Sequence, residues 1–207
     1  ALALEQAQVA LVTFLKRFPG NVYGRKLLAA TLLKKAQPQS AVHVLEPLLA
    51  KVTDDSTLFA LAGQAYLQNG QIDKAREYLE KAVSVAPREA KLRTNLGLTR
   101  LAAGDIERAV TDLESAVMLD PSDTAPEFHL VGVLIAQNLT ARALQVVQSL
   151  EKKHPDSAVT YQLKGAVHVA RQDPVSARQS FERALKIQPA YYPAAASMVQ
   201  MDLRENN

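Results

Sequence analysis

The prolines of this chain recur at a fixed interval, and this spacing restricts the possible fold more than any other feature of the sequence. The interval is 34 residues between Pro87, Pro121, Pro155 and Pro189. Pro19 lies two intervals before Pro87, and only Thr53 interrupts the series. Self-similarity at a period of about 20–50 residues is typical of repeat architectures, so we expect a repeat protein.

The residues between the prolines repeat in the same register. If each proline is placed at position 32, complete units are expected at residues 22–55, 56–89, 90–123, 124–157 and 158–191. Position 8 is then small or β-branched in all five units, as Ala29, Gly63, Gly97, Val131 and Gly165. Position 24 is large and apolar, as Leu45, Leu79, Leu113, Val147 and Phe181. A small residue lets two helices approach closely, so each unit is predicted to be a helical hairpin.

Residues that end helices fall where this register requires them. Gly70 and Gly104 occupy position 15 and suit the left-handed residue that ends a first helix, while proline at position 32 stops the second helix. Pro47 lies inside the second helix of the first unit and is expected to kink it, because it removes the backbone bond to His43.

Composition limits the kinds of function. The 24 basic and 21 acidic residues give a formal net charge of only +3, which is too small to drive binding to phosphate backbones or anionic lipid. No nucleic-acid partner is therefore expected. There is no cysteine, which removes thiolate nucleophiles and cysteine metal sites. The longest apolar stretch, residues 128–136, is shorter than the ~20 residues that span a bilayer, so this chain is not expected to insert into a membrane.

The sequence offers no pattern for catalysis. The four histidines, His43, His129, His154 and His168, have no metal-ligand spacing. Neither a phosphate-binding glycine loop nor a nucleophile elbow is present in the sequence. We therefore expect no enzyme activity, no cofactor and no metal site.

Residues 58–66, with Ala75, Leu79, Ala82 and Pro87, resemble the tetratricopeptide repeat family, and the resemblance extends over essentially the whole chain. It implies an all-α, right-handed superhelical solenoid of antiparallel helical hairpins, forming a single domain over residues 1–207. Five complete repeats would be flanked by half repeats, residues 2–18 and 192–204. Positions that depart from the family pattern are Arg93 and Glu127 at position 4, and Arg100 and His168 at position 11.

The terminal half repeats carry expectations of their own. Met198, Val199 and Met201 are expected to remain uncovered, and exposed apolar ends would favour end-to-end self-association. The chain begins at Ala1, in what reads as the middle of a helix, so we expect a fragment of a longer protein.

The family resemblance also implies a binding surface. First-helix positions 2, 5, 9, 12 and 13 of such repeats line a concave groove that binds a protein or peptide segment. The partner-binding residues predicted here are Tyr23, Lys26, Lys34, Gln64, Gln68, Lys91, Thr94, Leu98, Phe128, His129 and Gln162. Phe128 is the expected anchor, because aromatic residues often dominate binding energy. The carboxylate clamp of chaperone adaptors is not assembled, since Lys26 is followed by Ala30 at position 9.

A narrower resemblance suggests a cellular role. Residues 92–98, 100–105 and 191–196 are similar to tetratricopeptide lipoproteins of the bacterial PEP-CTERM/exosortase and exopolysaccharide system. This similarity implies a periplasmic scaffold, tethered to the outer membrane in the full-length protein. A cytoplasmic adaptor or regulator is the alternative, and direct polysaccharide binding stays open. An RNA-binding repeat is disfavoured by the 34-residue spacing and the +3 charge.

Overall fold

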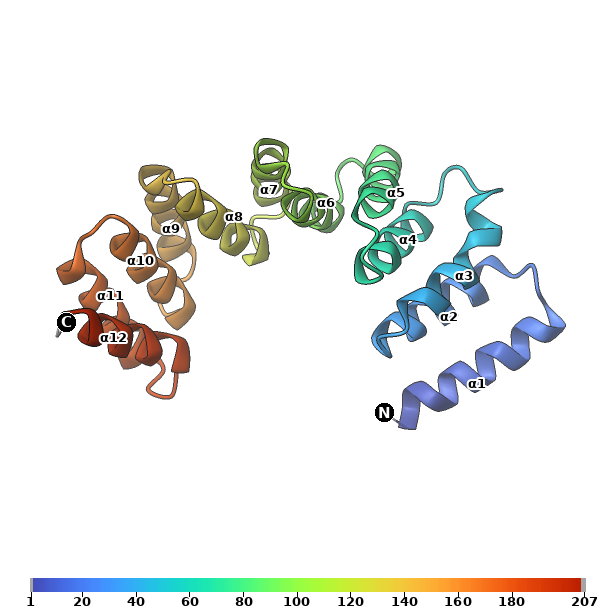
Figure 1. The fold of residues 1–207 in the computed structure, drawn as a ribbon, viewed down its shortest axis with the longest axis horizontal. Coiled ribbons are helices and arrows are strands. Elements are labelled where there is room, and N and C mark those ends of the chain that lie inside the picture. The colour runs from blue at the N-terminus through green and yellow to red at the C-terminus, as the bar shows by residue number, and fades with distance from the viewer. Residues whose placement is uncertain (1, 206–207) are drawn as a thin grey trace. The chain divides into compact units, whose positions relative to one another are not determined.

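The computed structural model describes residues 2–205, and every regular element in that range is an α-helix (Figure 1). The twelve helices are α1 (Leu2–Arg17), α2 (Val22–Lys34), α3 (Pro38–Leu49), α4 (Ser56–Gln68), α5 (Ile72–Val85), α6 (Ala90–Ala102), α7 (Ile106–Leu119), α8 (Ala125–Ala136), α9 (Thr140–Lys153), α10 (Ala158–Ala170), α11 (Pro174–Ile187) and α12 (Tyr192–Glu205). Consecutive helices pack as hairpins, α2 with α3, α4 with α5, α6 with α7, α8 with α9 and α10 with α11. These hairpins coincide with the five predicted units, so the predicted helical-hairpin fold is confirmed.

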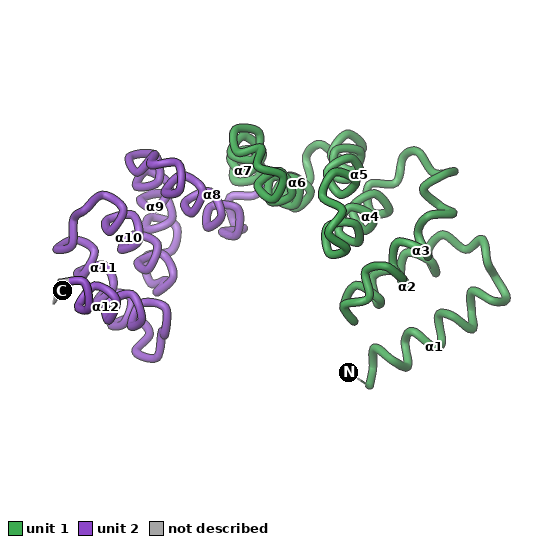
Figure 2. Tube along the Cα trace, in the orientation of Figure 1, with its two compact units in different colours: residues 1–119 green, residues 120–207 purple. Residues whose placement is uncertain are grey.

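The chain forms two compact units, residues 1–119 with α1 to α7 and residues 120–207 with α8 to α12 (Figure 2). In the first unit, α1 packs on α2 as the second helix of a preceding half repeat. In the second unit, α12 packs on α11 as the first helix of a following half repeat. The single solenoid over residues 1–207 stays a prediction.

Position 8 packs against position 24 within the second and fifth hairpins. A Cβ atom added to Gly63 would lie 2.6 Å from Leu79 Cγ, and one added to Gly165 would lie 2.2 Å from Phe181 Cε1. Carbon atoms cannot approach so closely, and both partners are buried, with exposed fractions of 1% each. Glycine is therefore required at Gly63 and Gly165 by the buried side chain that each of them faces.

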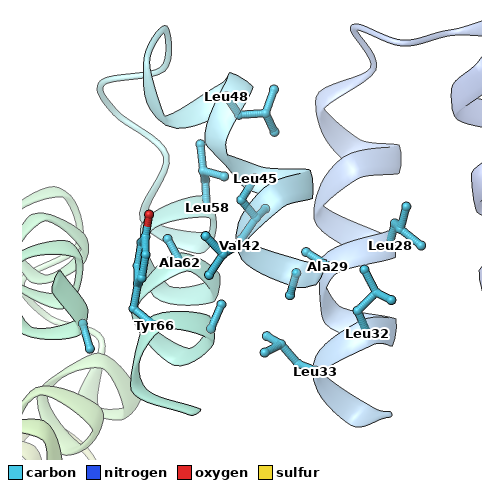
Figure 3. Close-up of a cluster of buried hydrophobic side chains, with 13 residues drawn as sticks. Leu28, Ala29, Leu32, Leu33, Val42, Leu45, Leu48, Leu58, Ala62 and Tyr66 are labelled. Atoms are coloured by element: carbon cyan, nitrogen blue, oxygen red, sulfur yellow. The ribbon is translucent and has the colours of Figure 1, made fainter. Parts of the chain in front are cut away.

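Among residues 1–119 the hydrophobic core continues from one hairpin to the next. Figure 3 shows this for α2, α3 and α4, where Leu28 and Leu32 of α2 belong to the same buried cluster as Val42 and Leu45 of α3 and Tyr66 of α4. Helix α3 thus buries one side against α2 of its own hairpin and another against α4 of the next hairpin. Neither hairpin of this group could bury its apolar residues alone, which is why repeats of this kind are stable only when stacked.

All five hairpin turns use a left-handed residue at position 15. These residues are Ala36, Gly70, Gly104, Asn138 and Gln172, with φ between 54° and 78°. In the second repeat the Gln71 N–H donates to the Tyr66 carbonyl at 2.8 Å, which satisfies a helix-end acceptor. The sequence identified only the two glycines; alanine and glutamine adopt this conformation because the hairpin requires it.

Pro47 shortens the second helix of the first hairpin. Helix α3 continues through Pro47 and ends at Leu49, after 12 residues, whereas α5, α7, α9 and α11 have 14 residues each. Proline removes a backbone hydrogen bond near this end, so the helix stops within a turn of it.

The unusual residues at positions 4 and 11 form an ionic cluster inside the third repeat. The carboxylate of Asp112, whose side chain is 2% exposed, accepts hydrogen bonds from Arg93 Nη1 at 3.1 Å and from Arg100 Nη1. Arg100 also contacts Glu80 of the preceding hairpin at 2.9 Å. In the second repeat the positions of Arg100 and Asp112 hold two tyrosines, whose rings stack with centroids 5.4 Å apart.

Two other departures from the family pattern also have charged partners. Glu127, with a side chain 1% exposed, contacts Lys153 Nζ at 2.7 Å. His168 Nδ1 lies 3.3 Å from Asp173 Oδ2, within ion-pair distance but without hydrogen-bond geometry. Each of these polar residues thus has one charged neighbour, while Glu127 Oε2 and His168 Nδ1 make no hydrogen bond within the described chain.

The expectation that Met198 and Met201 are uncovered is wrong. Met201 is 9% exposed, and both methionines pack in a cluster with Phe181 and Ala194. They turn toward α11, which α12 covers. Val199 does remain exposed, at 57%. End-to-end self-association stays a prediction.

Replacing Gly165 with alanine is expected to destabilise the chain by about 2 kcal/mol, because the new methyl group would overlap the buried ring of Phe181. Gly97→Ala is the matched control, since its Cβ would lie no closer than 3.1 Å to Leu113 and alanine favours the helix. Urea unfolding measures both changes. In a Phe181→Val background the cost of Gly165→Ala should fall sharply; an unchanged cost would contradict the packing argument.

Asp112→Ala is expected to cost about 3 kcal/mol of unfolding free energy, because Arg93 and Arg100 would lose their buried counter-charge. The double variant Arg100→Tyr with Asp112→Tyr copies the tyrosine pair of the second repeat and should lose less than Asp112→Ala alone. Thermal and urea unfolding compare the variants. If Asp112→Ala unfolds like the parent chain, the cluster contributes nothing to stability.

Candidate functional site

A cleft of about 330 Å³ lies between α4 and α6 in the first unit. We call it the α4–α6 cleft. Its lining residues are Gln64, Leu67, Gln68, Leu79, Lys91, Asn95, Leu98 and Thr99. Seven of these come from the first helices of two consecutive hairpins, and Leu79 comes from the second helix between them.

Helical spacing places the lining residues on facing surfaces. Gln64 and Gln68 are four residues apart on α4, and Lys91, Asn95 and Leu98 follow one another at intervals of four and three residues on α6. Side chains at these intervals lie on one face of a helix. Helix α4 therefore forms a wall with two amide side chains. Helix α6 forms the opposite wall, on which the ammonium group of Lys91, the amide of Asn95 and the apolar side chain of Leu98 follow one another.

The floor of the cleft is apolar and well packed. Leu79 is 1% exposed, while Leu67 and Leu98 are half-buried. Thr99 is fully buried and its hydroxyl donates to the Asn95 carbonyl at 2.9 Å, so it closes the base without offering a free donor.

The rim residues, in contrast, hold unused hydrogen-bonding groups. Gln64, Gln68 and Lys91 are exposed and Asn95 is half-buried. Over residues 2–205, none of these four side chains makes a hydrogen bond or an ion pair. The rim thus offers three primary amides, each able to donate and accept, and one positive charge without a counter-ion.

The structure brings four of the sequence-predicted residues together, namely Gln64, Gln68, Lys91 and Leu98. Sequence reasoning missed Asn95 and the buried residues of the floor. A signal was available for Asn95, because it lies one turn after Lys91 and one turn before Leu98, on the same helix face.

Two other predicted residues are engaged within the chain. Lys26 Nζ donates to Asp55 Oδ2 at 2.7 Å. Thr94 is 7% exposed and its hydroxyl donates to the Ala90 carbonyl at 3.0 Å, so it presents little surface to a ligand. Neither residue lines the α4–α6 cleft.

Asp55 has two roles at the start of α4. Besides the contact with Lys26, its carboxylate accepts the Leu58 backbone N–H at 2.9 Å and caps the helix. Partial burial raises the pKa of Asp55, but the hydrogen bonds from Lys26 and Leu58 outweigh burial and hold this pKa below its usual value.

The remaining predicted residues lie outside the cleft. Tyr23 is 72% exposed and Lys34 is exposed at the end of α2. In the second unit Phe128 is half-buried and His129 is exposed on α8. Gln162 is half-buried on α10, and its Nε2 donates to Ser197 Oγ of α12 at 3.0 Å.

No group of three or more histidine, aspartate or glutamate residues in the described part of the chain is placed to hold a metal ion. None of the helices within residues 2–205 combines the length and apolar character needed to cross a bilayer.

The Asp55–Lys26 contact predicts a pH-dependent contribution to stability. Because the pKa of Asp55 is lower in the folded chain than unfolded, the contribution is present above about pH 4 and is lost as the pH falls through the depressed value. Asp55→Asn keeps the cap and should cost about 1 kcal/mol at pH 7. The difference in unfolding free energy between parent and variant should shrink toward pH 3. A difference that does not change with pH would contradict a stabilising role of the ionised Asp55 carboxylate.

Comparison with known proteins agrees with this architecture. Two family models described as tetratricopeptide repeat match residues 60–126 and 100–167, together just over half of the chain. Protein IFIT1 homolog B of Homo sapiens is 32% identical over 74 residues, and the antiviral innate immune response effector IFIT1 of Macaca fascicularis is 34% identical over 74 residues. Each match covers 36% of this chain but only 16% of the relative.

Solved structures resemble the chain over most of its length. YrrB, described as a TPR protein with an unusual peptide-binding site, has a TM-score of 0.71 at 19% identity, covering 91% of this chain and 97% of YrrB. PilF of Pseudomonas aeruginosa has a TM-score of 0.74 at 17% identity, covering 96% of this chain and 90% of PilF. At such identities the likeness shows the fold alone. With the family models and the five hairpins, it establishes that the chain belongs to the tetratricopeptide repeat family.

Proposed function

We propose that this protein is a non-catalytic interaction scaffold that binds an extended segment of a partner protein in the α4–α6 cleft. One observation carries the proposal: four polar side chains without partners in the described chain, Gln64, Gln68, Lys91 and Asn95, surround an apolar floor. Such an arrangement leaves hydrogen-bonding capacity that only water or a ligand can use.

The chemistry of the rim suits a polypeptide backbone. An extended segment has unpaired N–H and C=O groups, and primary amides can satisfy both kinds at once. The cleft volume of about 330 Å³ is small. A helix with its side chains is about 10–12 Å across, so an extended strand of a few residues fits this space better than a helix does.

The family and its known structures support the same class of function. Tetratricopeptide repeat proteins generally act as scaffolds for protein interactions, and the description of YrrB names a peptide-binding site in a chain of the same fold.

For the cellular role we propose envelope exopolysaccharide export or protein sorting, in the periplasm and tethered to the outer membrane in the full-length protein. The support is the sequence resemblance of residues 92–98, 100–105 and 191–196. The alternative is a cytoplasmic adaptor or regulator, and a polysaccharide- or RNA-binding role ranks below both. Fractionation of cells that express the full-length protein separates the first two.

A photo-cross-linking experiment tests the cleft. A photoreactive amino acid replaces Gln68 in the cleft, and a second chain carries it at Lys74 of α5, an exposed residue that does not line the cleft. Cross-linking in extract of the source organism, followed by mass spectrometry, should attach one partner segment to the Gln68 position and not to the Lys74 position.

Leu98→Lys in the same photoreactive chain should abolish that cross-link, because a charge would enter the apolar part of the cleft. Val85→Lys is the matched control, since Val85 is 38% exposed in the same unit and outside the cleft. Thermal unfolding checks that both variants fold. Equal cross-linking by the parent chain and Leu98→Lys would contradict binding in the cleft.

A further inference from the structure

The α4–α6 cleft has a charge of one sign. Lys91 is its only charged lining residue, and its ammonium group is exposed and unpaired within the described chain. The nearest carboxylate in sequence, Glu89, is exposed at the N-cap of α6 and makes no contact with Lys91 at ion-pair distance. A ligand carboxylate at this end of the cleft would therefore meet an uncompensated positive charge.

The charge and the apolar part of the cleft are a fixed distance apart. Lys91 and Leu98 are seven residues apart on α6, which is about 10 Å along the helix axis, and they lie on the same face. Asn95 lies between them. Along the α6 wall of the cleft, an ammonium group, an amide and an apolar side chain therefore follow one another in that order.

An extended ligand can match this order in one way. Polyproline II advances about 3.1 Å per residue with three residues per turn, so residues i and i+3 lie on one side of the strand about 9 Å apart. A flat β-strand turns residues i and i+3 to opposite sides. The distance from Lys91 to Leu98 therefore fits two side chains separated by two residues in a polyproline-like segment.

We infer that the partner segment carries an aspartate or glutamate opposite Lys91 and an apolar residue opposite Leu98, with two residues between them. The inference rests on the proposed function of the cleft. Gln64, Gln68 and Asn95 then bind the main chain between the two anchors. We assign the carboxylate to a side chain; Lys91 is the one charged donor among the residues that line the cleft.

Defined peptides test this inference. Labelled peptides, acetylated and amidated at their ends, carry one aspartate and one leucine separated by one to four residues of alanine and proline. Fluorescence anisotropy measures their binding to the 207-residue chain. Affinity should be highest with two intervening residues, and replacing aspartate by asparagine should weaken it by about three- to tenfold at low salt.

The matching protein variants assign the effect to Lys91. Lys91→Ala should lower the affinity for the aspartate peptide by the same factor. The variant should then bind the aspartate and asparagine peptides equally well, as a double-mutant cycle requires. Lys91→Glu should regain affinity when the peptide aspartate becomes lysine. Lys51→Ala removes an exposed lysine of the same unit outside the cleft and should change nothing.

Three outcomes would overturn the inference. Binding that Leu98→Lys abolishes but that ignores the aspartate would leave the cleft as the binding site and refute the acidic anchor. Equal binding of free-acid peptides that lack aspartate would assign Lys91 to a terminal carboxylate. If none of the peptides binds and no cross-link forms at Gln68, both the inference and the proposed function fail.

Discussion

The contact between position 8 and position 24 sets the spacing of the helices in each hairpin, and the other features depend on it. The pair of residues at these two positions varies among the repeats, from Gly165 with Phe181 to Val131 with Val147, although the second and third repeats both pair glycine with leucine. Leu79 shows the link to function, because it packs against Gly63 and also forms the floor of the α4–α6 cleft. A change that moves Leu79 would therefore alter the hairpin and the candidate site together.

Once the spacing is set, the interior accepts different chemistry at equivalent positions. Tyr66 and Tyr78 stack in the second repeat, whereas Arg100 and Asp112 form an ion pair at the same two positions of the third. Both solutions fill the space, and in the ionic one Arg93 Nε and Arg100 Nε are buried without a hydrogen-bond partner among the described residues. The ionic version also reaches Glu80 of the preceding hairpin, so it ties neighbouring repeats by a directional contact that an apolar pair does not provide.

The candidate site differs from the interior in the state of its polar groups. In the ionic cluster the carboxylate of Asp112 is held by two arginines, and on α4 the cap Asp55 is held by Lys26 and a backbone N–H. At the cleft the polar side chains of Gln64, Gln68, Lys91 and Asn95 meet no partner among residues 2–205. Polar groups left free beside an apolar floor are what a binding surface needs and what a folded interior avoids.

The sequence alone determined the repeat length, the hairpins and the bounds of the terminal half repeats; those expected at residues 2–18 and 192–204 are α1, Leu2–Arg17, and α12, Tyr192–Glu205. These features follow from local periodicity, which recurs in every unit. The tertiary structure decided which side chains remain free. Lys26 is occupied by Asp55, 29 residues away, and Met201 is covered by packing on α11, while Asn95 joins the cleft. Pairing and burial depend on contacts between residues that differ from repeat to repeat, and a repeat pattern does not specify those contacts.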